Sequence, residues 1–339
     1  MTMIEALLKL NLSGMVGSAL LRELRRAVDL AKLDRLSEAE LRRVPGVGPI
    51  TARAIRHAPD PREEIALAAR HGVEILPLDD PRYPAPLKTL YDHPIVLYRR
   101  GEAVDVPAIG VVGSRECTDY GRRQAARFAR ELASMGVAIV SGLARGIDTA
   151  AHRGALEARD GRTIAVLGSG LLRAYPPENA GLLEEICRRG AAYSEFPLRT
   201  PPEGVNFPRR NRVIAGLALG VLVAEAGETS GALLTADWAV EQGREVFCLP
   251  GSVENPLSRG GHRLIRQGAK LVETPADILE EFPVFASLVA PATSLTPLER
   301  AVLRGRKKCS TPEGIAAETR LPLAAVERAL DSLGAKGVS

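Results

Sequence analysis

The chain has 339 residues, of which 45% are hydrophobic and 25% are charged, and its formal net charge is only +4. This composition excludes wholesale disorder, and the length predicts two or three domains. No apolar run reaches the roughly 18 residues of a membrane span, and the N-terminus lacks a signal-peptide pattern. We therefore expect a cytoplasmic protein that does not bind membranes.

The cysteines and the distribution of charge along the chain limit which kinds of binding site we expect. The four cysteines form no C-x-x-C pair, so we expect no metal site, no disulfide framework and no cofactor. Residues 1–72 hold 12 basic and 9 acidic side chains, residues 286–339 hold 8 and 5, and residues 73–285 hold 25 and 27. Nucleic-acid affinity of the middle must then come from a local patch rather than from bulk charge.

Residues 1–72 show apolar residues at helical spacing and predict short helices. The segment Leu41–Ala52 follows a helix-hairpin-helix pattern in which Gly46 and Gly48 make the turn before a helix N-terminus. Such an N-terminus can hold a phosphate, so both glycines are candidate contacts to double-stranded DNA. A purely structural hairpin is the alternative, because the turn requires the glycines in either case. Together with a degenerate hairpin at Gly14–Gly17, the segment predicts a helix-hairpin-helix or SAM-like domain.

Residues 73–105 predict a connector whose one or two strands join the edge of the next domain. Residues 106–285 then alternate apolar strands with helical patterns such as Tyr120–Met135 and Thr149–Ala158. This alternation predicts an α/β fold with a Rossmann-like, doubly wound parallel sheet. The expected strands are Ala108–Gly113, Val137–Ser141, Thr163–Gly168, Ala191–Ser194, Gly220–Ala224, Glu245–Leu249 and Ala269–Val272.

Residues 286–293 predict an Ala/Pro linker, and residues 294–339 predict three short helices, each with a proline near its start. Three such helices favour a winged-helix-like module. The chain stops at Lys336–Ser339, where a wing would begin, so we expect the wing to be absent or very short. A small helical domain that binds protein is the alternative.

Three glycine-containing loops follow predicted strands, and the carboxyl ends of parallel strands are where such sheets bind ligands. Their backbone amides can approach an anion, and two of the loops add an arginine that can hold a phosphate. The third loop lacks the last glycine of a dinucleotide motif, and the chain has no P-loop lysine. The loops are Gly110–Arg115, Ser141–Asp148 and Gly168–Leu171.

The densest signal is Asn206–Arg212, where three arginines and two asparagines surround Phe207 ahead of a helix. The arginines can track phosphates, while Phe207 or Tyr175 can stack on a base. The alternative is a capped helix whose arginines form ion pairs within the fold. We interpret Asp148 as a helix cap and His152 and Cys117 as structural.

The loops, the Tyr175-Pro176 pair, the Asn206–Arg212 run and the segment Ser230–Ala236 together resemble the DprA family of bacterial DNA-processing proteins, also called Smf. The resemblance implies an extended Rossmann domain that binds single-stranded DNA, usually as a homodimer, and no catalysis. It also implies a recombination mediator that protects incoming single strands and loads the RecA recombinase onto them against single-strand-binding protein. The implied setting is natural transformation, with repair a second possibility.

We expect arginines at the carboxyl edge of the sheet to surround a groove, with glycine-loop amides holding consecutive phosphates. The family often carries a lysine shortly after Tyr175-Pro176, whereas this chain has Glu178, so Arg173 is the candidate replacement. The residues expected to contact single-stranded DNA are Gly113, Ser114, Arg115, Gly142, Arg145, Gly146, Gly168, Ser169, Gly170, Arg173, Tyr175, Asn206, Phe207, Arg209, Arg210, Asn211 and Arg212.

Two alternatives belong to other functional classes. The middle domain also resembles nucleotide phosphoribohydrolases in architecture, but their P-G-G-x-G-T-x-x-E motif is replaced by Glu225–Leu233. A hydrolase of nucleoside monophosphates is therefore the enzyme alternative, and it rests on fold analogy alone. An adaptor that recruits RecA while DNA binding is incidental is the third hypothesis.

Overall fold

The computed structural model describes residues 1–285, 296–306, 309, 311–319 and 321–335. The chain divides into two compact units with the boundary between Ile278 and Leu279, and each is described by itself. The predicted linker at 286–293 and the predicted absence of a wing at Lys336–Ser339 lie outside the described residues.

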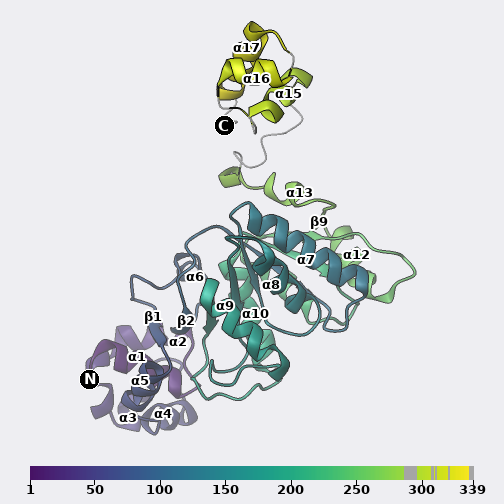
Figure 1. Cartoon of the computed structure of the whole chain (residues 1–339). Coiled ribbons are helices and arrows are strands. Elements are labelled where there is room, and N and C mark those ends of the chain that lie inside the picture. Colours follow the sequence, from purple (N-terminus) through teal and green to yellow (C-terminus); the bar gives the residue numbers. More distant parts are fainter. Residues whose placement is uncertain (286–295, 307–308, 310, 320, 336–339) are drawn as a thin grey trace. The chain divides into compact units, whose positions relative to one another are not determined.

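A nine-stranded sheet forms the centre of the first unit, with the order β1-β2-β6-β5-β4-β3-β7-β8-β9 (Figure 1). Strands β3 to β9 pair in parallel, whereas β1 and β2 are antiparallel at one edge and carry residues of the predicted connector. The predicted α/β class with a mostly parallel sheet is confirmed. The strands are β1 Val73–Pro77, β2 Val96–Gly101, β3 Ala108–Gly113, β4 Ala138–Ser141, β5 Thr163–Val166, β6 Ala191–Ser194, β7 Gly220–Glu225, β8 Glu245–Cys248 and β9 Lys270–Leu271.

The strand order reverses direction at β3, because β3 pairs with β4 on one side and with β7 on the other. Right-handed crossovers then place the helices after β3, β4 and β5 on one face of the sheet and those after β6, β7 and β8 on the opposite face. A crevice at the carboxyl ends of β3 and β7 follows from this reversal. The helices are α7 Asp119–Ser134, α8 Ile147–Glu157, α9 Ala180–Arg189, α10 Asn206–Leu217, α11 Ala232–Glu241 and α12 Arg259–Arg266.

A strand ends where its backbone stops hydrogen-bonding to the neighbouring strand. Sequence patterns predict these ends less accurately than they predict the strand itself. The predicted bounds of β3 and β6 are those observed, since both are continuous buried runs between turns. The prediction Thr163–Gly168 is two residues too long, because β5 ends at Val166 and the chain turns into the Gly168 loop. At the end of β3 the register with β7 shifts between Val112 and Gly113, which redirects the following loop.

The N-terminal helices share a hydrophobic core with one end of the sheet. Leu7, Leu8 and Leu24 belong to the same buried cluster as Tyr98 of β2 and Leu198 after β6. Tight turns separate the helices where glycines take a positive φ: +68° at Gly14 and +83° at Gly46. The helices are α1 Met3–Leu12, α2 Ser18–Ala27, η1 Leu30–Arg35, α3 Glu38–Leu41, α4 Pro49–Arg56 and α5 Pro61–Arg70, and α6 Ala85–Lys88 and the 3-10 segments η2 Pro177–Asn179 and η3 Pro256–Ser258 complete the unit.

The second unit begins within α13 Pro275–Leu279 and contains η4 Pro283–Phe285 and three helices. Their core is formed by Val302, Ile315, Val326, Ala329 and Leu333. The described part of this unit contains no strand. The three helices are α15 Pro297–Arg306, α16 Pro312–Thr319 and α17 Leu323–Ala335.

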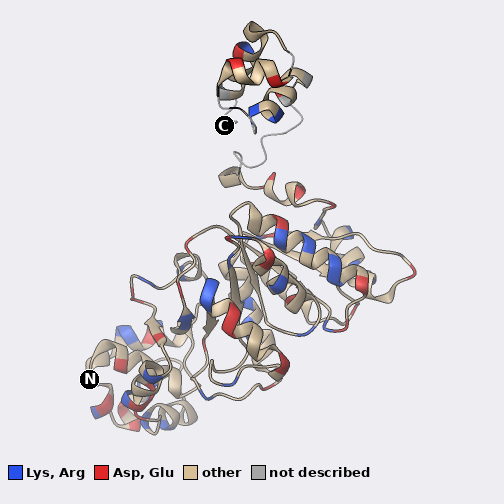
Figure 2. Ribbon diagram, viewed as in Figure 1, with Lys and Arg blue, Asp and Glu red and all other residues tan. Residues whose placement is uncertain are grey.

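Charged side chains of both signs are interspersed over the described elements (Figure 2). Among these elements no helix combines the length and apolarity needed to cross a bilayer.

Close packing of α7 against α8 generates a stability prediction. Gly154 of α8 faces the backbone of Ala126 so closely that an added Cβ would clash with its carbonyl oxygen. Gly154→Ala should therefore lower the free energy of unfolding by about 1–3 kcal/mol, although alanine is the better helix former. Thermal and denaturant unfolding of the full chain measure the change.

Gly181 is the matched control, because it also lies in a helix, α9, and nothing lies within 4 Å of an added Cβ. Gly181→Ala should leave stability unchanged or raise it by up to about 1 kcal/mol. Equal stability of the two variants would contradict the packing argument.

Candidate nucleic-acid interface

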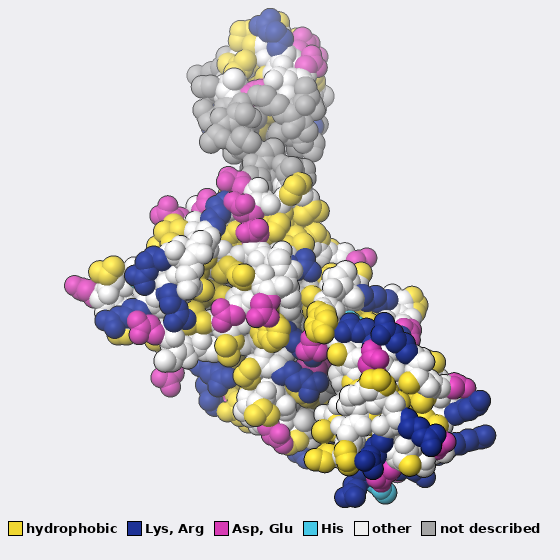
Figure 3. Space-filling view, turned by 180° about the vertical axis from the view of Figure 1, so that it is seen from behind, with side chains coloured by type: hydrophobic (Ala, Val, Ile, Leu, Met, Phe, Trp, Pro, Cys, Tyr) yellow, Lys and Arg dark blue, Asp and Glu magenta, His cyan; other side chains and the backbone are white. Residues whose placement is uncertain are grey.

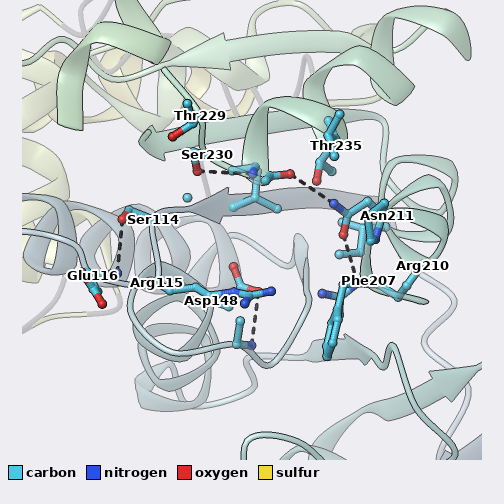
Figure 4. A pocket seen from close by; sticks show the side chains of 18 of the residues that line it. Ser114, Arg115, Glu116, Asp148, Phe207, Arg210, Asn211, Thr229, Ser230 and Thr235 are labelled. Carbon is cyan, nitrogen blue, oxygen red and sulfur yellow. Dashed lines mark hydrogen bonds between the residues drawn. The ribbon is translucent and has the colours of Figure 1, made fainter. Parts of the chain in front are cut away.

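A cavity of about 820 Å3 lies at the carboxyl ends of β3, β4 and β7, where the strand order reverses. Its lining comes from the loops after these strands and from the first turns of α10 and α11. Figure 4 shows side chains from several of these elements directed toward one another. A smaller adjoining cavity is lined by Arg115, Gly142, Ala144, Arg145, Tyr175, Pro176 and Phe207.

Arg115, Phe207 and Tyr175 line both cavities and form a cluster of one cation and two rings. The Arg115 guanidinium carbon lies 5.3 Å from the centroid of the Phe207 ring, and the Phe207 and Tyr175 centroids are 5.9 Å apart. Arg115 is exposed and forms no ion pair with any described residue. The cluster therefore offers a free positive charge beside aromatic surface, which suits a phosphate next to a base.

The loop that carries Arg115 is held by hydrogen bonds to Glu225 at the end of β7. The Ser114 amide donates to the Glu225 carbonyl at 2.7 Å, and the buried Glu225 carboxylate accepts from the Thr118 amide and hydroxyl, each at 2.7 Å. On the other side of the loop, Gly146 has a φ of +73° and packs closely against the backbone of Ser114 and Arg115, so that an added Cβ would clash there. Arg115 thus projects from a fixed backbone, which lowers the entropy lost when it binds a ligand.

Phe207 lies in the first turn of α10, and its ring covers Gly168. A Cβ on Gly168 would lie 2.8 Å from the ring, so the glycine makes this position available. Three residues further along α10, Arg210 is 4% exposed and donates from Nη1 to the carbonyl of Gly142 at 2.7 Å and to that of Val166. These bonds attach the helix to the ends of β4 and β5 and so fix the position of Phe207.

Arg210 and Asp148 are both buried, and the opposite charge of each shifts the pKa of the other. Burial lowers the pKa of Arg210 to about 10, an effect that Asp148 opposes. Burial raises the pKa of Asp148, while Arg210 and the amides of Gly142 and Ala144 act in the opposite direction. Those amides donate to Asp148 Oδ2 at 3.1 and 3.3 Å, so the carboxylate orders the loop after β4.

The arginines that we expected to surround the groove have different surroundings in the structure. Arg212 is 2% exposed and pairs with Glu195 at 2.6 Å and with Asp92 at 3.1 Å, and Arg209 pairs with Glu195 at 2.9 Å. Neither lines the two cavities. The alternative of ion pairs within the fold is therefore the better description of these two, and Arg210 is also held by internal acceptors.

Some of the remaining predicted residues line one of the two cavities, and the others lie outside both linings. Those that line a cavity, besides the aromatic cluster, are Gly113, Ser114, Gly142, Arg145, Arg210 and Asn211. Those outside both linings are Gly146, Gly168, Ser169, Gly170, Arg173 and Asn206, together with Arg209 and Arg212. Gly170 packs against the carbonyls of Pro197 and Leu198, so its role here is close packing. Gly46 and Gly48 belong to the α3–α4 hairpin and line neither cavity.

Arg145 has a partner that sequence patterns did not indicate. Its guanidinium hydrogen-bonds the carboxylate of Glu178, and both side chains are about half exposed. The Arg145 hydrogen bond holds the pKa of Glu178 below its ordinary value. The predicted phosphate contact at Arg145 is thus occupied by an internal anion.

The residues interpreted as structural are bonded inside the fold. His152 is fully buried with Nδ1 2.7 Å from the Thr163 hydroxyl, and burial lowers its pKa to about 3. Burial also raises the pKa of the Cys117 thiol, which disfavours the reactive thiolate. Asp148 lies inside α8 rather than at its cap position, which is Gly146, so the interpretation as a cap was wrong.

Sequence reasoning missed Thr229, Gly231 and Thr235 as lining residues. The signal for them was present, because they follow β7 and precede α11 in the same strand–loop–helix order as the three glycine loops. Without the strand order, nothing placed this loop beside the one that follows β3.

The buried Glu195 generates the second prediction. Its carboxylate is 4% exposed and serves both Arg212 and Arg209. Glu195→Gln should lower the free energy of unfolding by about 3 kcal/mol, because it leaves a buried guanidinium undercompensated. Urea unfolding of both proteins measures this.

A surface pair supplies the control. Glu184 pairs with Arg100 at 2.5 Å but is about half exposed, so Glu184→Gln should change stability by at most about 1 kcal/mol. A Glu195→Gln protein as stable as this control would show that the buried pair does not hold α10 in place.

Comparison with known proteins identifies the family. Residues 74–283 match the model of the family described as DNA recombination-mediator protein A. Protein Smf of Escherichia coli is 50% identical over 209 residues, which cover 61% of this chain and 56% of the relative. DprA of Bacillus subtilis is 41% identical over 222 residues, which cover 65% of this chain and 74% of that protein. The match thus spans little more than half the length of the E. coli relative.

Solved structures agree with this assignment. The crystal structure of DprA from Streptococcus pneumoniae superposes with a TM-score of 0.70 at 37% identity and covers 81% of this chain and 96% of that chain. DprA from Helicobacter pylori, whose structure concerns its single-stranded DNA binding mode, gives a TM-score of 0.56 at 28% identity over 62% of this chain and 94% of that one. The chain therefore belongs to this DNA recombination-mediator protein A family.

Proposed function

We propose that this protein binds single-stranded DNA in the crevice between the β3 and β7 loops. The observation that carries the proposal is Arg115, an exposed guanidinium without a described ion-pair partner, set against Phe207 in a cavity-lining cluster. Arg115 holds a backbone phosphate, and a base stacks on Phe207 or Tyr175. Every base has a π face, so the site reads little sequence.

The preference for single strands follows from the aromatic contacts. Bases in a duplex are paired and stacked, so their faces are not available to Phe207 and Tyr175 without unstacking. Glycine-loop amides of Gly113 and Gly142 add donors near the phosphates. The structure of the H. pylori protein concerns single-stranded DNA binding, which supports the same ligand class for this chain.

On this basis the protein acts as a recombination mediator that protects incoming single strands and loads RecA onto them in the cytoplasm. Family membership supports this role. We assign it to natural transformation, with repair as a second setting, and expect it to act against single-strand-binding protein. A homodimer would place two crevices on one strand and raise the avidity.

The flanking helices have proposed roles of their own. The α3–α4 turn, a helix-hairpin-helix candidate, is flanked by the exposed Arg42, Arg43, Arg53 and Arg56, for which no ion pair with a described residue is present. Figure 3 shows basic side chains projecting over the N-terminal helices. We propose that this turn adds a phosphate contact through Gly46 and Gly48. The second unit is proposed as a winged-helix-like module.

Arg115 provides the direct test of the site. Arg115→Ala should weaken binding of a dT oligomer, and the log–log salt slope should become less negative by about 0.7, the share of one phosphate contact on a single strand. Fluorescence anisotropy across a salt series measures both quantities.

Arg123 of α7 is exposed and has no ion pair with a described residue, so it gives the charge-matched control. Arg123→Ala should keep the wild-type slope. An Arg115→Ala protein with unchanged affinity and salt slope would show that single-stranded DNA does not bind at Arg115.

Removal of the negative charge from the Arg145–Glu178 pair should raise the affinity for DNA. A DNA phosphate at Arg145 must displace the Glu178 carboxylate, so the pair competes with DNA. Glu178→Gln should tighten binding of the dT oligomer by about two- to fivefold and make the salt slope steeper by about 0.7. The same anisotropy series measures this.

Glu184→Gln removes an equal charge from another half-exposed pair and should change neither quantity. Identical behaviour of the two variants would mean that only the net charge matters and that Arg145 does not contact DNA.

A further inference from the structure

The side chains of the β7 loop line the cavity, but the site described above assigns them no contact with a ligand. Thr229, Ser230 and Gly231 form a turn between β7 and α11, and all three line the cavity. Figure 4 shows Thr229, Ser230 and Thr235 on one side of the cavity and Arg115, Asp148 and Phe207 on the other. The cavity is large enough, at about 820 Å3, for more than the ligand groups that Arg115 and Phe207 engage.

Thr235 is the observation that points to a ligand. The residue is only 1% exposed, it lines the cavity, and its hydroxyl forms no hydrogen bond with any described residue. Figure 4 shows its oxygen directed toward the cavity. The hydroxyl is not one of the sealed polar atoms that lack a partner, so it is reached from the cavity. An occupant of the cavity would supply the missing partner.

The start of α11 is suited to an anion. Gly231 is the N-cap residue and has no side chain to cap the helix, and its own amide donates to no described acceptor. The Ser230 hydroxyl oxygen accepts from the Ala232 amide at 3.3 Å, which leaves its proton free for another acceptor. The positive end of the helix dipole adds to these donors.

The carboxylate at the end of β7 does not compete for these donors. Glu225 accepts hydrogen bonds from Thr118 and from Asn255, the latter at 3.1 Å. The carbonyl of Gly231 is likewise engaged, by the Asn211 side-chain amide at 3.2 Å. The Gly231 amide and the Ser230 and Thr235 hydroxyls remain at this end of the cavity as neutral donors with no acceptor among the described residues.

We propose that the Thr229–Gly231 turn, the N-terminus of α11 and the Thr235 hydroxyl form a second phosphate subsite in the same crevice. The proposal rests on the proposed function, since it extends the nucleotide-binding crevice beyond Arg115. The ligand is the phosphate of a nucleotide, either a backbone phosphate of single-stranded DNA or the phosphate of a free nucleoside monophosphate. Because the donors are neutral, the subsite contributes affinity without releasing further counterions.

Thr235→Val tests this assignment with little risk to the fold, because valine has nearly the same shape and no hydrogen bond is lost within the protein. Thr89→Val, which removes an exposed hydroxyl bonded to Pro86, is the control. Binding of a dT oligomer across a salt series and binding of dTMP, followed by calorimetry, are measured for both variants and for wild type. Ser230→Ala is the second variant of the subsite.

We expect Thr235→Val to weaken dT-oligomer binding by about tenfold at every salt concentration, with an unchanged slope, whereas Thr89→Val binds as wild type. If dTMP also binds wild type and loses affinity in Thr235→Val, a free nucleotide uses the subsite as well. If only the oligomer is affected, the phosphate comes from DNA.

Wild-type affinities of both Thr235→Val and Ser230→Ala for both ligands would overturn the subsite. That result is distinct from failure of the proposed function, which Arg115→Ala tests separately through its altered slope.

Discussion

The buried guanidinium of Arg210 is the interaction on which the geometry of the crevice depends. It binds carbonyls at the ends of β4 and β5, and Asp148 compensates its charge while ordering the β4 loop through two amides. Gly142 must lack a side chain, because a Cβ there would lie 2.5 Å from the guanidinium. Since Phe207 lies one turn earlier on α10, the same bonds determine where a stacked base would lie.

This arrangement separates the arginines into two groups with different tasks. Arg210 and Arg212 are buried and satisfy acceptors of the fold, and Arg209 shares Glu195 with Arg212. Arg115 is left free to bind a ligand, and Arg145 is held by an exposed carboxylate that a phosphate can replace. The proposed DNA binding would then depend on few cations, in agreement with the slightly acidic balance of residues 73–285.

Sequence patterns located the sheet and the loops that line the cavity better than they assigned individual side chains. Continuous apolar runs predicted β3 and β6 to the residue, and the rule that ligands bind at carboxyl ends of parallel strands placed the Gly113–Arg115 loop correctly. The division of the arginines was not predictable locally, because their partners lie far along the chain: Glu195 for Arg212, and Gly142 and Val166 for Arg210. Thr235 was missed for the same reason, since only the pairing of β3 with β7 brings its loop to the crevice.

Whether the crevice binds single-stranded DNA is decided by binding of the wild-type protein to single- and double-stranded oligomers of equal length across a salt series. We expect tight binding to single strands, with a linear fall of log affinity against log salt and a clear preference over the duplex. Equal affinity for single and double strands would contradict the proposed site, because it would mean that no unpaired base stacks on Phe207. The absence of binding at low salt would contradict it as well.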